Sequence, residues 1–483
     1  MAETSIAIQH GAVRGAVTGG LLAFKGIPYA AAPVGPNRFR PPQPVEPWAG
    51  VRNAVEFGPT APKAPYAPPL DALIPEVDIP GDEYLNLNVW TPETTGRRPV
   101  LVWIHGGAFV NGSGSAYDGS AFARDGVVCV TLNYRLGADG FLYLGENSNL
   151  GLLDQIAALQ WVQDNIEAFG GDPGQVTVFG ESAGAMSIGT LLGMPAARGL
   201  FRRAILQSGA AHHSVTPSTG RLITRHLAEQ LRVRPTADGF ANAPISELVA
   251  ASQQLRATIS AQPDAALWGE AATNLLPFAP VIDGVTLPGP PIGNLAPDVD
   301  IMVGSNADEF RLYLVPSGLW PHIDETALRA MLDRYELDDS AVAAYRAQRP
   351  DAEANELFAA IVTDWVFRIP AIRLAEASRK AYMYEFAWQP PTFRGELGAC
   401  HAAEIPFVFD ALDSKAFTGL IGDHPPQYLA DELHSAWVSF ATNGNPGWFG
   451  YQEGSRSTMR FDLESEIVMD PGAGERAVWE GKR

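Results

Sequence analysis

The chain has 483 residues, with 54 Asp and Glu against 34 Lys and Arg, so its formal net charge at pH 7 is −20. This charge argues against nucleic acid or an anionic membrane surface as a partner. Hydrophobic residues make up 46% and aromatic residues 10% of the chain, which is typical of a well-packed globular protein and not of a disordered one.

Length alone would allow about three domains. No charge run, Gly/Ser tract or internal repeat divides the sequence, so we predict one domain over residues 1–483. The first residues lack the basic and apolar regions of a signal peptide, and no apolar run is long enough to span a bilayer. We therefore expect a soluble, cytoplasmic protein. The sequence does not set its oligomeric state, and a monomer is compatible with it.

In chain order, residues 4–17 predict a β-hairpin. Near-continuous apolar runs follow, which are typical of strands buried on both faces of a parallel or mixed sheet. They lie at residues 99–104, 127–133, 175–179, 203–207, 301–303 and 381–386. Residues 153–169 carry apolar side chains at helical spacing. This alternation predicts an open α/β sheet flanked by helices, with ligand chemistry at the carboxyl ends of the strands.

Three segments are irregular. Residues 59–80 contain seven prolines and little periodicity, which predicts a long loop. Residues 268–280 and 313–321 are rich in Trp, Phe, Leu and Pro. They are either surface loops over a helical region or the wall and rim of a substrate pocket, and the sequence leaves both interpretations open.

The segment Gly180-Glu181-Ser182-Ala183-Gly184 joins the apolar run 175–179 to a stretch of small residues suited to open a helix. A serine with glycine two residues before and after it, between strand and helix, is the nucleophile-elbow pattern. Glycine has no Cβ, so strand and helix can approach closely while the serine stands out in a strained conformation. We therefore predict that Ser182 is a nucleophile.

A serine nucleophile needs a base, usually a histidine that a carboxylate orients. His401 is the candidate, because it follows the run 381–386 on a loop, where an α/β hydrolase places its base. For the carboxylate, Asp308 and Glu309 both follow the run 301–303, and the residues alone do not decide between them. Surface or capping roles suit seven other histidines, namely His10, His212, His213, His226, His322, His424 and His434.

The turn His105-Gly106-Gly107-Ala108-Phe109 follows the run 99–104. Small residues here let backbone N–H groups approach a developing oxyanion, together with the amide after the nucleophile. A tight turn alone would explain the glycines but not their pairing with a downstream elbow.

The chain has two cysteines, which form neither a disulfide framework nor a zinc-binding pattern. Cys129 lies in an apolar run and is expected to be a buried thiol in a central strand. Cys400 precedes His401; a reactive thiol is the alternative there, but Ser182 already fills the nucleophile role.

Taken together, these motifs resemble the type-B carboxylesterases, the esterase/cholinesterase family of α/β-hydrolases, and especially bacterial para-nitrobenzyl-esterase-like members. The resemblance runs nearly end to end. It rests on separate blocks in the family's order, at residues 24–30, 38–39, 85–90, 133–137, 149–155, 170–173, 207–209, 280–284 and 437–441.

The resemblance implies an α/β-hydrolase fold with a large, mostly parallel mixed sheet and inserted helices and loops around an active-site gorge. It aligns the nucleophile with Ser182, the acid with Glu309 and the base with His401. It further implies oxyanion donors at the amides of Gly107, Ala108 and Ala183, and Ser208 close behind the site. Arg38 and Asp82 fall where the family has an ion pair, with Asp82 in place of the usual Glu. Tyr84 replaces a disulfide Cys of secreted relatives, which agrees with a reducing compartment.

The function implied is that of a serine carboxylic-ester hydrolase that works through an acyl-enzyme and needs no metal or cofactor. Its expected partner is a small neutral aryl or alkyl ester with a short to medium acyl chain; acceptance of bulky alcohols is a further hypothesis. Within hydrolases, the alternative is hydrolysis of aryl carbamates, amides or phthalate diesters. The alternative from another class is a non-catalytic binding module, a role in which nucleophile or base is lost.

Overall fold

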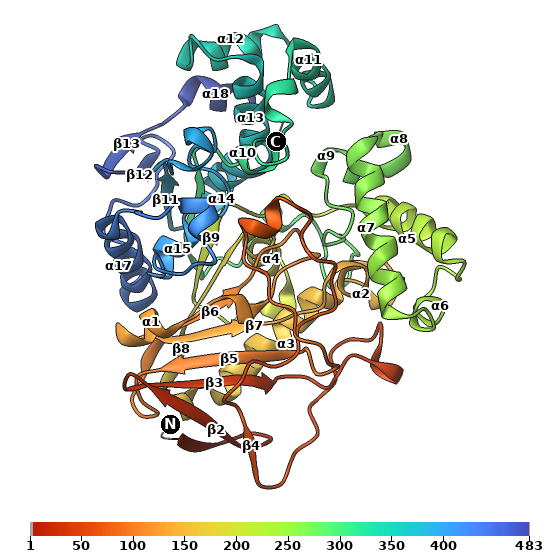
Figure 1. Ribbon diagram of the computed structural model, residues 1–483, viewed down its shortest axis with the longest axis vertical. Coiled ribbons are helices and arrows are strands. Elements are labelled where there is room, and N and C mark those ends of the chain that lie inside the picture. Colours follow the sequence, from red (N-terminus) through yellow and green to blue (C-terminus); the bar gives the residue numbers. More distant parts are fainter. Residues whose placement is uncertain (1–2, 483) are drawn as a thin grey trace.

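A 13-stranded sheet runs through the centre of the computed structural model, which describes residues 3–482 (Figure 1). Its strands are β1 (Glu3–Ile8), β2 (Gly11–Thr18), β3 (Leu21–Pro28), β4 (Val51–Asn53), β5 (Asn86–Thr91), β6 (Arg98–Ile104), β7 (Val128–Leu132), β8 (Gly171–Glu181), β9 (Arg203–Gln207), β10 (Asp300–Asn306), β11 (Ala381–Phe386), β12 (Ser457–Phe461) and β13 (Glu466–Met469).

The strand order is β1-β2-β3-β5-β7-β6-β8-β9-β10-β11-β12-β13, with β4 beside β2. From β7 to β12 all neighbours are parallel, whereas β1, β2, β3, β5 and β13 pair antiparallel at the two ends. The prediction of an α/β fold with a mostly parallel mixed sheet is therefore confirmed.

Helices connect and cover the parallel strands. They are α1 (Ser120–Arg124), α2 (Gly137–Phe141), α3 (Leu150–Asn165), α4 (Ala183–Leu191), α5 (Pro217–Leu231), α6 (Ala237–Ala241), α7 (Ile245–Ala261), α8 (Ala265–Trp268), α9 (Ala271–Asn274), α10 (Arg311–Leu314), α11 (Glu325–Arg334), α12 (Asp339–Gln348), α13 (Ala354–Thr363), α14 (Ile369–Ala377), α15 (Ile405–Val408), α16 (Thr418–Ile421), α17 (Gln427–Asn443) and α18 (Ala473–Val478). Two groups stand out from the sheet in Figure 1: α5–α9, which follow β9, and α11–α13, which follow β10. Within residues 3–482, every helix is too short or too polar to cross a membrane.

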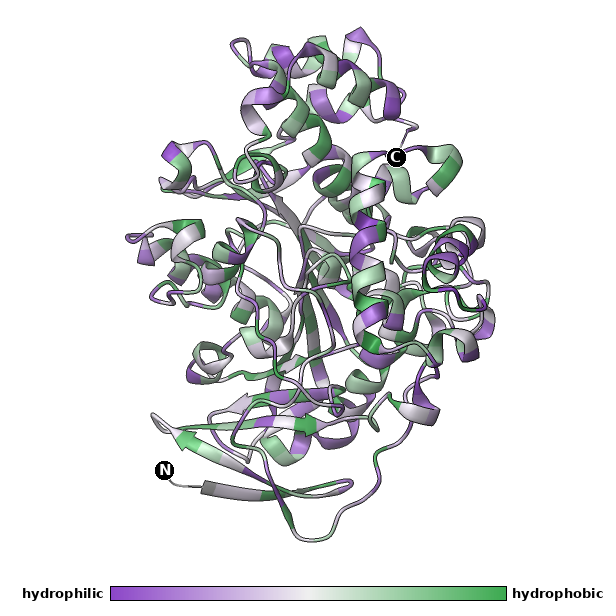
Figure 2. Cartoon of the chain, turned by 45° about the vertical axis from the view of Figure 1, so that its right-hand side comes forward, coloured by the Kyte–Doolittle hydropathy of each residue, from purple (hydrophilic) through white to green (hydrophobic). Residues whose placement is uncertain are grey.

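Strand β6 explains why the central runs read as continuously apolar. Val100, Val102 and Ile104 belong to one core cluster, and the alternating Leu101 and Trp103 belong to a second one. Successive side chains of a strand point to opposite faces, so both faces of the sheet are packed. Figure 2 shows these hydrophobic strands in the interior, between helices on both sides.

The elements agree with the sequence expectations in type and differ at their ends. The hairpin is β1–β2, and the runs 203–207 and 381–386 match β9 and β11 residue for residue. The helix expected at 153–169 begins at Leu150 and ends in a 3-10 turn over Ile166–Phe169. Residues 59–80 form a loop with one 3-10 turn at Leu70–Ala72, as predicted.

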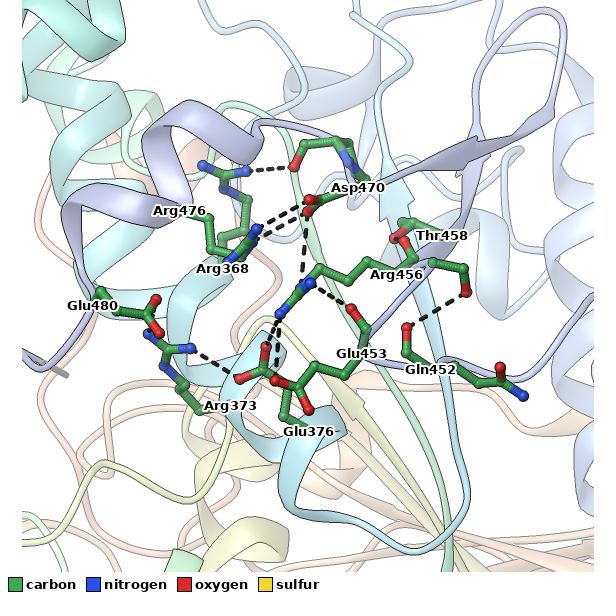
Figure 3. A network of polar contacts seen from close by, with 12 residues as sticks. Arg368, Arg373, Glu376, Gln452, Glu453, Arg456, Thr458, Asp470, Arg476 and Glu480 are labelled. Atoms are coloured by element: carbon green, nitrogen blue, oxygen red, sulfur yellow. Dashed lines mark hydrogen bonds and ion pairs between the residues drawn. The ribbon is translucent and has the colours of Figure 1, made fainter.

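The C-terminal β12–β13–α18 segment is fastened to α14 by a network of charged side chains (Figure 3). Arg456 Nη2 lies 3.0 Å from Glu376 Oε1, and Arg476 Nη2 lies 3.0 Å from Asp470 Oδ2. These side chains are partly buried, so solvent and salt screen the pairs less than they would fully exposed ones. The Arg456–Glu376 pair therefore connects the residue before β12 to α14.

Candidate active site

Ser182 lies between the end of β8 and the start of α4, with φ 53° and ψ −124°. This is a sparsely populated backbone region for a residue with a side chain. The surrounding fold holds it there: the Ser182 amide donates to the carbonyl of Gln207 at 2.8 Å, and the Met186 amide donates to the Ser182 carbonyl at 2.8 Å.

The glycines of the elbow allow β6 to approach the turn. A Cβ on Gly184 would lie 1.9 Å from the carbonyl oxygen of Ile104, and one on Gly180 would lie 2.5 Å from the same atom. No side chain fits at these distances, so both positions require glycine. This close approach brings the loop after β6 next to Ser182.

That loop contains Gly107 with φ 110° and Ala108 with φ 53°. The Gly107 carbonyl accepts from the amides of Val110 and Asn111, both at 2.9 Å, which closes a tight turn. Among the described residues, the amides of Gly107, Ala108 and Ala183 donate to no protein acceptor. The three amides thus lie close to the Ser182 side chain: two belong to the neighbouring loop and one to the residue after Ser182. None of them has a protein acceptor in the described part of the chain.

His401 is 3% exposed and follows β11, while Glu309 is fully buried and follows β10. His401 Nδ1 lies 2.6 Å from Glu309 Oε2, and the His401 amide donates to the Glu309 carbonyl at 3.2 Å. Glu309 Oε1 accepts from the Asn306 amide at 2.8 Å, which fixes the carboxylate. Of the two candidate acids Asp308 and Glu309, it is therefore Glu309 that contacts the His401 imidazole, at Nδ1.

Asp308 has a different set of partners. Its Oδ2 accepts from the Ala399 amide at 3.1 Å, and its Oδ1 lies 3.1 Å from Arg311 Nη2. Through its hydrogen bond from the Ala399 amide, Asp308 therefore stabilises the loop that carries His401.

The second carboxylate at the imidazole is Glu181, the middle residue of the elbow motif. Its Oε1 lies 2.9 Å from His401 Nε2, the nitrogen that faces away from Glu309. Within residues 3–482, Nε2 therefore has an ion-pair contact with Glu181, whereas no hydrogen bond joins it to the Ser182 hydroxyl. Catalytic hydrogen bonds are often long in enzymes without substrate and tighten only in the substrate complex.

Two carboxylates change the protonation of His401. Burial lowers the pKa of His401, but Glu181, Tyr313 and Glu309 together outweigh burial and raise the pKa well above its ordinary value. The imidazolium form is thus favoured in the resting site.

A third buried glutamate lies close behind. Glu404 accepts from Gln207 Nε2 at 3.0 Å and from Asn306 Nδ2 at 2.7 Å. Burial raises the pKa of Glu404 to about 7, and the nearby Glu181 and Glu309 add to the effect. Sequence reasoning missed the roles of Glu181, Gln207 and Glu404. Glu181 directly precedes Ser182 and Glu404 lies three residues after His401, which was the available signal, whereas Gln207 is near neither of them in the chain.

Aromatic rings flank His401: Phe367 at 4.7 Å and Tyr313 at 5.7 Å between ring centroids. Tyr313, the first residue of the segment 313–321, therefore borders the site. Trp268 instead packs on His226 of α5 at 4.6 Å, so residues 268–280 begin within the group α5–α9.

Several sequence expectations need correction. Arg38 does not pair with Asp82 among the described residues; its Nε lies 3.8 Å from Asp139 Oδ1, because Asp82 is exposed whereas Asp139 is buried beside Arg38. His213 and His434 are not surface residues but are 2% and 3% exposed, since each packs against neighbouring elements. The expectation for Ser208 is not among these corrections and stays a prediction: Ser208 is buried directly after β9, and its hydroxyl has no hydrogen-bond partner within residues 3–482.

Both cysteines are fully buried and unpaired. Cys129 lies in the central strand β7, as expected. Burial raises the pKa of the Cys400 thiol, and the Cys400 carbonyl accepts from Asn306 Nδ2 at 2.8 Å. This environment disfavours a reactive thiol at Cys400.

Comparison with known proteins gives a consistent result. The family model described as "Carboxylesterase family" matches residues 2–469. The chain is 38% identical to para-nitrobenzyl esterase of Bacillus subtilis, over 99% of this chain and 98% of that protein. It is 36% identical to phenmedipham hydrolase of Pseudarthrobacter oxydans, over 90% and 89%.

Among solved structures, a carboxylesterase of Geobacillus stearothermophilus superposes with a TM-score of 0.85 at 37% identity, covering 99% of this chain and 100% of that one. The mostly parallel mixed sheet flanked by helices is thus that of the α/β-hydrolase fold of these carboxylesterases. On sequence, family model and structure alike, the chain belongs to the carboxylesterase family.

Proposed function

We propose that this protein is a serine hydrolase that cleaves neutral carboxylic esters through an acyl-enzyme. The proposal rests on three features that meet at the elbow. Ser182 is strained, the amides of Gly107, Ala108 and Ala183 beside it have no acceptor among the described residues, and His401, paired with Glu309, contacts the elbow residue Glu181. Family membership supports it, because relatives with the same overall fold are named as esterases.

In the proposed reaction, His401 takes the Ser182 hydroxyl proton while Ser182 Oγ attacks the ester carbonyl carbon. The amides of Gly107, Ala108 and Ala183 stabilise the negative charge that moves to the carbonyl oxygen, and each such donor can be worth about 2.7–4 kcal/mol. The imidazolium, steadied by Glu309, then protonates the leaving alcohol. A water molecule repeats the cycle on the acyl-enzyme and releases the acid.

Glu181 adds a step to this cycle. Its carboxylate holds His401 Nε2 at 2.9 Å in the free enzyme. For His401 to accept the serine proton, the imidazolium must first release its Nε2 proton to solvent, and the neutral Nε2 must then contact the Ser182 hydroxyl instead of Glu181. We propose that substrate binding drives this exchange.

The first test is steady-state hydrolysis of para-nitrophenyl esters from acetate to dodecanoate, with Ser182→Ala alongside. We expect highest kcat/KM on short to medium acyl chains, and a loss on the order of 10⁶-fold in kcat in the variant. A Ser182→Ala protein with full turnover would contradict the mechanism, and a maximum at long chains would indicate a lipase.

A second candidate is cleavage of aryl carbamates, amides or phthalate diesters with the same residues. One relative of similar coverage is named phenmedipham hydrolase, so the family includes proteins named for other substrates. Parallel kcat/KM measurements on an aryl ester and its matched aryl carbamate decide which bond is preferred. Labelling by a fluorophosphonate separates either hydrolase from a non-catalytic binding module, which should not react.

A further inference from the structure

Residues 60–79 form a closed strap over the turn that carries the proposed oxyanion donors (the strap lies in the orange-red part of the chain in Figure 1). The two ends of the strap meet: the Thr60 amide donates to the Ile79 carbonyl at 2.9 Å, and the Ile79 amide donates to Thr60 Oγ1 at 3.1 Å. Such a closed loop is an ordered unit and not a free linker.

A buried cation fixes the interior of the strap. Lys63 is 1% exposed in its side chain, and its Nζ donates to the Val77 carbonyl at 2.9 Å and to Thr60 Oγ1 at 3.2 Å. Glu76 Oε1 lies 3.7 Å from the same Nζ. A buried ammonium is tolerated only with such partners, so Lys63 and Glu76 hold each other in place.

The same Glu76 reaches across to the oxyanion turn. Its Oε2 accepts from Asn111 Nδ2 at 3.0 Å, and its Oε1 accepts from the Gly112 amide at 3.3 Å. Asn111 Nδ2 also donates to the Ala64 carbonyl of the strap at 2.7 Å. Three hydrogen bonds thus connect the strap to the end of the turn.

Asn111 also contacts Gly107, whose amide is one of the proposed oxyanion donors. The Asn111 amide donates to the Gly107 carbonyl at 2.9 Å, and a Cβ on Gly107 would lie 2.3 Å from the Asn111 carbonyl oxygen. The peptide of Gly107 therefore has little freedom as long as Asn111 is held. Oxyanion stabilisation is sensitive to such placement, because donors must lie about 2.7–3.1 Å from the developing oxyanion.

We propose that Glu76 is a positioning residue for the proposed ester hydrolysis: through Asn111 it fixes the Gly107 and Ala108 amides in the orientation that binds the oxyanion. The inference rests on the proposed function. In this proposal, the strap stabilises the turn that carries the oxyanion donors. The Lys63 ammonium is the counter-charge that holds the Glu76 carboxylate in contact with Asn111.

The test compares Glu76→Ala and Glu76→Gln with a matched control, Asp78→Asn. Asp78 is on the same strap and 4.0 Å from Lys63 Nζ, but its side chain is 73% exposed and makes no contact with Asn111. Three quantities are measured: kcat and KM on a para-nitrophenyl ester, and the Ki of an alkyl trifluoromethyl ketone. Ser182 Oγ adds to this ketone, the hydroxyl proton passes to His401, and the carbonyl oxygen becomes an oxyanion in the proposed hole.

For Glu76→Ala we expect kcat to fall 10- to 100-fold and the ketone Ki to rise by a similar factor, with KM changed less than about threefold. Glu76→Gln keeps an acceptor for Asn111, so it should retain part of the activity, and Asp78→Asn should stay within twofold of wild type. Hydrogen exchange of residues 105–112 should accelerate in Glu76→Ala, which reports the loosened turn independently of activity.

Unchanged kcat and Ki in Glu76→Ala would overturn the inference, as would equal losses in Asp78→Asn. A change in KM alone would also overturn it, since that indicates lost substrate contacts. A wild-type protein that neither turns over esters nor binds the ketone would instead overturn the proposed function; unaccelerated exchange in Glu76→Ala would then reject the brace as well.

Discussion

At the scale of single residues, the clearest feature is an imidazole held between two carboxylates. His401 Nδ1 lies 2.6 Å from Glu309, and Nε2 lies 2.9 Å from Glu181. Glu309 can serve throughout the proposed cycle, because it orients the ring and steadies the imidazolium. Glu181 has two opposing effects: it stabilises the imidazolium, but it also occupies the nitrogen that must accept the serine proton.

Glu181→Gln should therefore shift the pH dependence of hydrolysis. His401 acts as a base only when neutral, so kcat/KM rises with pH through its pKa. The negative charge of Glu181 raises the pKa of His401. Removing that charge lowers this pKa, so the acidic limb of the kcat/KM profile should move to lower pH, by about one unit or more. The measurement is kcat/KM on a neutral ester between pH 4 and 9.

Glu167→Gln is a suitable control. The Glu167 side chain is 70% exposed, and its ion-pair partner is Arg97, which is not one of the proposed catalytic residues. An acidic limb that stays in place in Glu181→Gln, or moves equally in the control, would show that Glu181 does not set the protonation of His401. Glu309→Gln should behave differently: the fold remains, and kcat falls by about 10⁴ because the ring loses its orienting charge.

The sequence predicted the candidate nucleophile and base but not this second contact. The elbow pattern specifies glycines around a serine and leaves the residue between them free. The direction of the Glu181 side chain follows from packing against the loop after β6, where Gly106 leaves room for the carboxylate: a Cβ on Gly106 would lie 2.6 Å from Glu181 Oε2. The Arg38 pairing was wrong for a similar reason, because the position of Asp139 relative to Arg38 depends on tertiary structure.

At the scale of elements, the site depends on the close approach of β6, β8 and α4. The carbonyl oxygen of Ile104, at the end of β6, contacts the positions of both elbow glycines. Because the obstructing atoms belong to the backbone of a central strand, they cannot move aside as a flexible side chain would.

Gly184→Ala should consequently disrupt the elbow. The added Cβ would lie 1.9 Å from the Ile104 oxygen and 2.8 Å from its carbonyl carbon. We expect a loss of more than about 3 kcal/mol in the free energy of unfolding, with activity lost in parallel. Denaturant unfolding monitored by tryptophan fluorescence measures the first quantity.

The matched control is Gly293→Ala, where an added Cβ meets no atom within 4 Å and φ is not positive. Alanine should be neutral or slightly stabilising there, by up to about 1 kcal/mol, because it reduces the entropy of the unfolded chain. A Gly184→Ala protein as stable as this control would refute the steric argument.

Apart from the hairpin β1–β2, the strands predicted from the sequence were those buried on both faces, since continuous apolar runs mark them directly. The amino- and carboxyl-terminal ends of β8 and β10 were missed. Strand β8 begins at Gly171, four residues before the apolar run, where Gly and Pro interrupt the pattern. Strand β12 and the edge strand β13 were also missed: β13 shows no buried residue, so hydrophobicity gives no signal for it.

At the scale of the whole molecule, the sheet separates two core clusters, and both cysteines belong to the second one. This cluster contains residues of β6, β8 and β11 together with Ala399, Cys400 and Ala402, which flank His401. The loop that carries the proposed base is thus part of the packed core and not a surface appendage. Local opening of that loop should require disruption of the cluster around it.

The thiols make this expectation measurable. Both are fully buried, and burial raises their pKa values, which disfavours the reactive thiolate. In the native protein at pH 8, a thiol reagent such as DTNB should label neither cysteine, and both should react after denaturation. Across a urea titration, labelling of Cys400 should coincide with loss of esterase activity, because the same cluster holds Cys400 and His401. Cys129→Ser and Cys400→Ser assign the two reactions. Labelling of Cys400 in a fully active protein would show instead that the loop opens independently of the core.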